Sequence, residues 1–204
     1  MKKWIAFLLP LVMCSGLVAC TNSTAPMTTS QTDKPSYEEV EIQADFHYST
    51  WGMSKEEVIQ AETELTLVDA GEYLIAEDAV IAQADASLLF EFNEGKLVSG
   101  VVRFKTQHSN ENLYLDDYGT IKDSLTEKYG TPSVDKKEWK DTLYQNDPED
   151  WGFAVSLGDL ALISGWETNT TKITHVLNGD NYEIMHGILY TQIGHKTEKN
   201  TDGL

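Results

Sequence analysis

Closely spaced strand-like segments constrain the fold of this chain more than any other feature of its sequence. Residues 87–92 and 97–104 flank a short polar turn at residues 93–96. Apolar residues alternate with others along residues 87–92, as expected for a strand with one buried face. The other expected strands are residues 72–75, 80–84, 151–157, 160–166, 172–177 and 182–190, with further tight turns at residues 157–160 and 178–181.

Two helices are predicted among these strands. The first begins with a capping box, in which the Ser54 hydroxyl and the Glu57 carboxylate each satisfy a free backbone amide. The second covers residues 113–129, and Gly130 and Pro132 supply its stop. Strands joined by short turns favour an α+β fold over a doubly wound sheet. We therefore expect one or more antiparallel sheets with two helices, an order that admits a pseudo-repeat of a helix followed by antiparallel strands.

The N-terminus has the proportions of a secretory signal. Lys2 and Lys3 precede an apolar run of roughly a dozen residues. Pro10 interrupts this run and Ser15 ends it, short of the about 20 apolar residues that a spanning helix needs. A retained transmembrane helix is therefore not expected.

The segment Leu17-Val18-Ala19-Cys20 that closes this run resembles the lipobox of bacterial lipoproteins. The resemblance implies cleavage before Cys20 and attachment of a diacylglycerol to its sulfur, which gives a stable membrane anchor. The protein would then lie on the extracytoplasmic face of the cell membrane, or on the outer membrane if the organism has one. The alternative is an ordinary cleaved signal that releases the protein.

Lipidation would leave the mature chain without a free thiol, because Cys14 lies in the segment that is removed and Cys20 carries the lipid. Cysteine hydrolases, thiol oxidoreductases and cysteine-ligated zinc sites are thereby excluded, and the domain must fold without disulfides. The expected organisation is a signal peptide at 1–19, a lipidated Cys20 with a flexible linker at 20–44, a single α+β domain at 45–192 with halves at 45–107 and 108–192, and a polar tail at 193–204.

The chain is strongly acidic. Removing residues 1–19 deletes two lysines and no acidic residue, which takes the formal charge from −18 to about −20. Phosphates and anionic lipid headgroups repel such a body, so nucleic-acid binding is not expected and membrane contact should come through the lipid. The charge favours a basic partner or cations, or simply keeps the protein soluble.

Two short motifs resemble BamE (SmpA/OmlA-type) lipoprotein domains. Residues 52–58 (GMSKEEV) are similar to the start of the first helix of those domains, and residues 129–132 (YGTP) are like their helix exit. Tandem versions of this helix-plus-hairpin unit build the β-lactamase-inhibitor-like proteins. The first half lacks the Gly-x-Pro exit. The resemblance implies a scaffolding or binding module and assigns no functional residue.

Candidate metal ligands are limited to two histidines. His175 and His186 lie on successive predicted strands, so a simple hairpin would bring them near one another. A two-histidine site is weak without a third ligand, and strand histidines more often have structural or surface roles. No cofactor is predicted.

Tryptophans supply the candidate binding residues. Trp51 and Trp151 are each followed by glycine near the start of an element, and we expect them to be more exposed than Trp139 and Trp166. An exposed indole can stack on a sugar or form the centre of a protein interface.

No motif of a known reaction is present. We expect a non-enzymatic binding or assembly module whose partner is another envelope protein, held by a sheet face or an exposed edge. The alternative is a lipoprotein that binds a cell-wall sugar or a divalent cation, and a hydrolase built from scattered carboxylates is a third reading.

Overall fold

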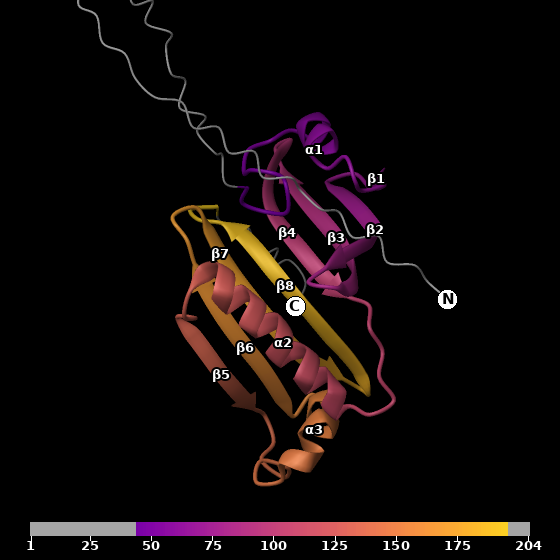
Figure 1. Ribbon diagram of the computed structural model, residues 1–204, viewed down its shortest axis with the longest axis vertical. Helices are drawn as coiled ribbons and strands as arrows, with labels where there is room; N and C mark the ends of the chain where they lie inside the picture. The colour runs from indigo at the N-terminus through magenta and orange to yellow at the C-terminus, as the bar shows by residue number, and fades with distance from the viewer. Residues whose placement is uncertain (1–43, 196–204) are drawn as a thin grey trace, which may run out of the picture. The chain divides into compact units, whose positions relative to one another are not determined.

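Antiparallel strands make up most of the domain. A computed structural model describes residues 44–195, so the expected signal, Cys20, nearly all of the linker and most of the tail lie outside the described residues. The strands are β1 (Leu67–Asp69), β2 (Tyr73–Ile81), β3 (Ala84–Asn93), β4 (Lys96–Phe104), β5 (Val134–Trp139), β6 (Leu160–Glu167), β7 (Thr171–Asp180) and β8 (Glu183–Gln192). They form one eight-stranded sheet in the order β1-β2-β3-β4-β8-β7-β6-β5 (Figure 1). The expected α+β class with an antiparallel sheet is confirmed.

The strand boundaries differ from expectation at two places. The segments expected at residues 72–75 and 80–84 belong mostly to the single strand β2, which has an irregular register between Ala76 and Ala79. The turn expected at residues 178–181 falls later, because β7 and β8 pair as far as Asp180 and Glu183. Asn181 and Tyr182, both with positive φ, form the turn instead, as in the tight turns that join twisted strands.

The first two helices are those that the sequence predicts. In α1 (Lys55–Ala61) both hydrogen bonds of the capping box between Ser54 and Glu57 are present. The second helix, α2 (Asn112–Tyr129), ends at Gly130, whose φ of 85° is a backbone conformation that favours glycine. Its buried residues Tyr118, Ile121 and Leu125 lie at helical spacing.

The strand expected at residues 151–157 is wrong, because these residues form the helix α3 (Trp151–Leu157), which follows a 3₁₀ turn at Pro148–Asp150. The segment alternates large and small residues well enough to read as a strand. Gly158 then adopts a left-handed conformation and ends the helix, so the turn expected at residues 157–160 is a helix cap. Residues 44–195 therefore contain three α-helices instead of two.

The short edge strands β1 and β5 were not expected either. Strand β5 carries adjacent lysines and is exposed apart from the half-buried Trp139, so it lacks the apolar alternation that marks a half-buried strand. Charged residues on an edge strand also oppose pairing with another sheet.

The pseudo-repeat does not hold in detail. Each half begins with a helix and ends with a strand at the centre of the sheet, where β4 pairs with β8. The helix α3, however, lies between β5 and β6 and has no counterpart in the first half.

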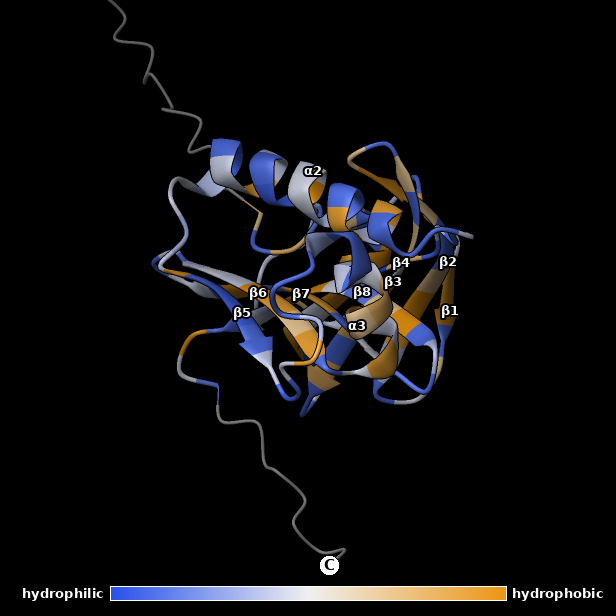
Figure 2. Cartoon of the chain, turned by 90° about the horizontal axis from the view of Figure 1, so that it is seen from below, coloured by the Kyte–Doolittle hydropathy of each residue, from blue (hydrophilic) through white to orange (hydrophobic). Residues whose placement is uncertain are grey.

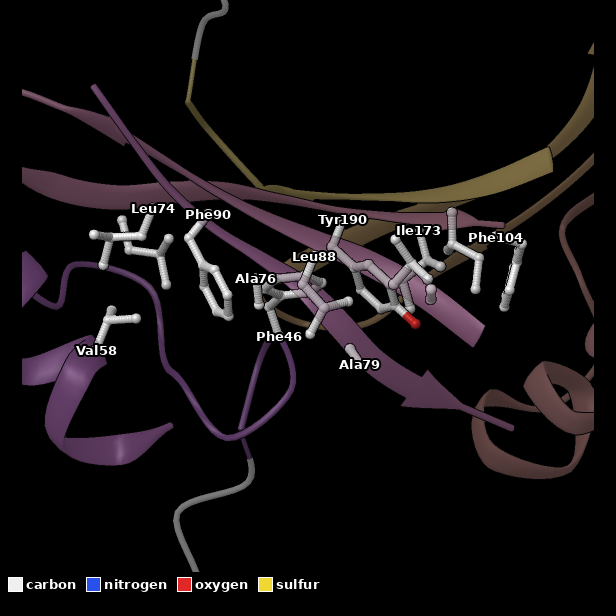
Figure 3. Packing of buried hydrophobic residues seen from close by; sticks show 14 of the residues in the cluster. Phe46, Val58, Leu74, Ala76, Ala79, Leu88, Phe90, Phe104, Ile173 and Tyr190 are labelled. Atoms are coloured by element: carbon white, nitrogen blue, oxygen red, sulfur yellow. The ribbon is translucent and has the colours of Figure 1, made fainter. Parts of the chain in front are cut away.

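All three helices pack against one face of the sheet, and Figure 2 shows α2 above the strands. Val58 of α1 and Ile121 of α2 belong to the main core cluster, whose strand residues point to that face. Phe46, before α1, fills the space above Gly100 and contacts the rings of Phe90 and Tyr190 (Figure 3). No helix within residues 44–195 combines the length and apolar character needed to cross a membrane.

Candidate functional site

A row of aliphatic side chains crosses the face of the sheet that the helices leave open. Consecutive Cα partners connect one residue of every strand, and all but Thr174 and Gly165 are aliphatic. We call this set the apolar row: Val68, Ile75, Leu89, Val101, Leu189, Thr174, Gly165 and Val134. Leu189 is 42% exposed although β8 lies at the centre of the sheet, so no described residue covers the row there.

Polar and charged residues border the apolar row. Glu91 and Lys172 lie one step along their strands on one side, and Arg103 and Lys136 lie on the other. A shallow hollow of about 170 Å³ lies over the row where β4, β8 and β7 meet, lined in part by Val101 and Leu189. An apolar strip with a charged border is the usual anatomy of a surface that binds another protein.

A second candidate surface lies on the helix side. The groove between α2 and β5 has a volume of about 550 Å³. We call it the α2–β5 groove, and it is lined by Leu115, Tyr118, Gly119, Lys122, Asp135, Lys136, Lys137, Trp151 and Leu162. Its size is that of a small-molecule site.

Hydrogen bonds connect the floor of the α2–β5 groove to its rim. The Tyr118 hydroxyl lies 2.7 Å from Ser164 Oγ, and Ser164 donates to Asp135 Oδ1 at 2.9 Å. Lys122 Nζ lies 3.1 Å from the other carboxylate oxygen of Asp135. Burial raises the pKa of Asp135, but hydrogen bonds from Ser164 and Lys122 outweigh it and lower the pKa overall. Asp135 is therefore an ionised carboxylate that holds Lys122 in place.

Burial also controls the hydroxyl of Tyr118. It raises the pKa of Tyr118 to about 12, against the hydrogen bond with Ser164. The phenol stays protonated at neutral pH and acts as a hydrogen-bonding group.

The structure separates the two candidate tryptophans. Trp151 lines the α2–β5 groove, with Lys137 Nζ 3.9 Å from the centre of its ring. Trp51 packs against the main core cluster, and its Nε1 donates to Thr171 Oγ1 at 2.9 Å. Trp51 therefore holds the first half against β7, whereas Trp151 forms part of a pocket.

His175 and His186 come together as the hairpin predicted, but inside the core. Their Nε2 atoms lie 2.8 Å apart, so one ring donates a hydrogen bond to the other. The ring of Tyr118 stacks on His175 with centroids 4.1 Å apart. Burial lowers the pKa of His175 to about 3 and that of His186 to about 4. Both rings are therefore neutral at physiological pH.

Within residues 44–195 no third histidine, cysteine or carboxylate side chain gathers with the histidine pair to complete a metal site. The direct hydrogen bond also occupies the nitrogen that each ring turns toward the other. His186 and Asp117 both line a pocket of about 330 Å³, where Asp117 accepts from His108 at 2.7 Å.

Sequence reasoning missed the lysines and Gly119 of the α2–β5 groove. The adjacent pair Lys136-Lys137 in so acidic a chain was the available signal. They lie close to Lys122 because they belong to β5, a strand that the apolar pattern did not predict.

Comparison with known proteins assigns no family to this chain, since no family model, no curated protein and no solved structure matches it.

Proposed function

We propose that this protein is a non-enzymatic, protein-binding lipoprotein, held on the extracytoplasmic face of a bacterial membrane by the lipid on Cys20. It binds another envelope protein with the apolar row. The observation that carries this proposal is the line of aliphatic residues on the open face of the sheet, continuous from Val68 to Leu189, which costs solubility unless a partner covers it.

The chemistry of the partner follows from the surroundings of the apolar row. An apolar segment of the partner would cover the row, and acidic groups flanking that segment would meet Arg103, Lys136 and Lys172. The net charge of −18 attracts a basic partner and speeds its encounter with the row.

Site-specific crosslinking in intact cells tests this proposal. A photo-crosslinking amino acid at Leu189 should capture one specific envelope protein, and the same group at Leu113 should not. These leucines are a matched pair, because Leu189 is 42% exposed on the open face and Leu113 is 41% exposed on α2.

Charged variants complete this test. Leu189→Asp should abolish capture from a crosslinker at Val101, and Leu113→Asp should leave it unchanged. Absence of any specific adduct, or equal capture with both variants, would contradict the proposal.

A second candidate function is the binding of a cell-wall sugar, which Trp151 in the α2–β5 groove favours. The groove has apolar walls and hydrogen-bonding groups, a combination that suits one face of a pyranose and its hydroxyls. Titration with N-acetylglucosamine, a wall sugar, should shift the NMR signal of the Trp151 indole N–H and leave that of Trp51 in place. No shift from any wall saccharide would remove this candidate. Within residues 44–195 no group of three side-chain ligands favours the binding of a divalent cation.

A further inference from the structure

We infer that the α2–β5 groove selects an anionic saccharide, a sugar that carries a carboxylate or a phosphate. This inference rests on the second proposed function, the binding of a cell-wall sugar, and deepens it. It is independent of the apolar row, which lies on the opposite face of the sheet.

The charge of the groove is the first reason. The chain has a formal charge of −18, yet Lys122 of α2 and Lys137 of β5 both line this pocket. Lys122 pairs with Asp135. Lys137 forms no salt bridge within residues 44–195 and instead lies over the Trp151 ring. Its ammonium is the group available to a ligand anion.

The walls of the groove indicate what kind of molecule carries the anionic group. Leu115 and Leu162 supply apolar surface, and Trp151 and Tyr118 supply aromatic surface. A ring with one apolar face can pack on such walls while its substituents reach the lysines. A bare inorganic anion would leave these walls uncovered.

Gly119 is the third reason. It lies in the interior of α2, where a glycine weakens a helix relative to alanine. A Cβ built there meets no atom within 4 Å, so packing does not require glycine. Its missing side chain keeps the α2 wall of the groove open.

The lysines are also held in position before a ligand arrives. Ser164 is fully buried and fixes Asp135, which in turn fixes Lys122 on α2. The ring of Trp151 orders Lys137 from the other side. Because these side chains are ordered already, binding loses less conformational entropy.

Calorimetric titration of the full chain with three sugars tests the inference. The probes are N-acetylmuramic acid, which has a carboxylate, N-acetylglucosamine 6-phosphate, which has a phosphate, and neutral N-acetylglucosamine. We expect at least one anionic sugar to bind ten-fold or more tightly than the neutral one. Added salt should shrink this advantage, since it screens the lysines. Binding of one anion and not the other also supports the inference and identifies the acidic group.

Lysine variants separate the charge from the pocket. Lys137→Gln should remove most of the preference for the anionic sugar and leave the affinity for the neutral sugar unchanged. Lys172→Gln, an exposed lysine of β7 on the open face, is the matched control and should change neither.

Filling the groove tests its location. Gly119→Leu should abolish binding of all three sugars, while the exposed Ser124→Leu on the same helix should not. Circular dichroism checks that both variants fold. Equal affinity for neutral and anionic sugars would overturn the inference and leave sugar binding standing. Binding of none of them would overturn both, and binding undisturbed by Gly119→Leu would place the site elsewhere.

Discussion

His175 and His186 form a direct hydrogen bond between their Nε2 atoms, 2.8 Å apart, beneath α2. Only one of the two nitrogens can carry the proton between them, so a second proton would force the rings apart or place a charge in the core. His175 Nδ1 is buried without a partner in the described part of the chain. Protonation of the pair therefore destabilises the folded state directly.

Acidification should destabilise the domain through this pair. Burial lowers the pKa of His175 to about 3 and that of His186 to about 4, with His186 and Lys122 facing the former and Asp117 the latter. Below about pH 6.5 the histidines of the unfolded chain, whose pKa is 6.5, bind protons, whereas those of the folded chain stay neutral. This part of the stability is complete above about pH 6.5 and decreases towards about pH 4, by at most about 1.4 kcal/mol per pH unit for each histidine.

Urea unfolding between pH 7.5 and 4.5 measures this loss. The double variant His175→Phe, His186→Leu is the comparison, since it keeps a ring under Tyr118 and removes both titrating groups. Its free energy of unfolding should change less with pH than that of the parent. Parallel curves for the two proteins would refute a role for the pair.

Glu62→Gln should destabilise the domain by about 2 kcal/mol, because a buried carboxylate with several donors is replaced by an amide that cannot accept from all of them. Glu62 is 1% exposed and accepts from Ser49 Oγ at 2.7 Å, from the Tyr48 amide at 3.0 Å and from His47. Thermal unfolding followed by circular dichroism provides the measurement. Glu56→Gln, exposed on α1, should change stability by less than about 0.5 kcal/mol, and equal effects of both variants would contradict the prediction.

Gly119→Ala should stabilise the domain by about 0.5–1 kcal/mol, because alanine favours the helix and its methyl group meets open space. Gly152→Ala in α3 is the opposite case. Its Cβ would lie 2.3 Å from the backbone carbonyl carbon of Glu111, so this substitution should destabilise. The urea midpoints of both variants measure the difference in stability. Midpoints that shift in the same direction for both variants would contradict this prediction.

Cys20→Ala should stop incorporation of a labelled fatty acid and leave the precursor uncleaved or the protein released. The lipid attaches to the sulfur in the lipobox reading, so no other residue can replace it. Labelling and membrane fractionation of cells that express the variant check this. Cleaved protein that stays with the membrane would rule the reading out.

Local signals predicted the elements that depend on neighbouring residues. The capping box at Ser54 and Glu57 needs only its own turn, and the β3–β4 hairpin pairs across a turn of a few residues. The sequence also placed His175 near His186, because one hairpin connects them. It failed at residues 151–157, where a short apolar segment fits a strand and a helix equally well and contacts with distant residues decide.

By itself, then, the sequence determined the antiparallel α+β class, the two capped helices and the pairing of nearby strands, since these follow from periodicity and turn chemistry. Tertiary structure alone decided which surfaces exist. The apolar row is assembled from single residues of all eight strands, and no one strand displays it. The α2–β5 groove brings Lys122 of α2 close to Lys137 of β5, a strand that carries no apolar pattern. Surfaces built from distant residues depend on register and packing, which a linear pattern does not encode.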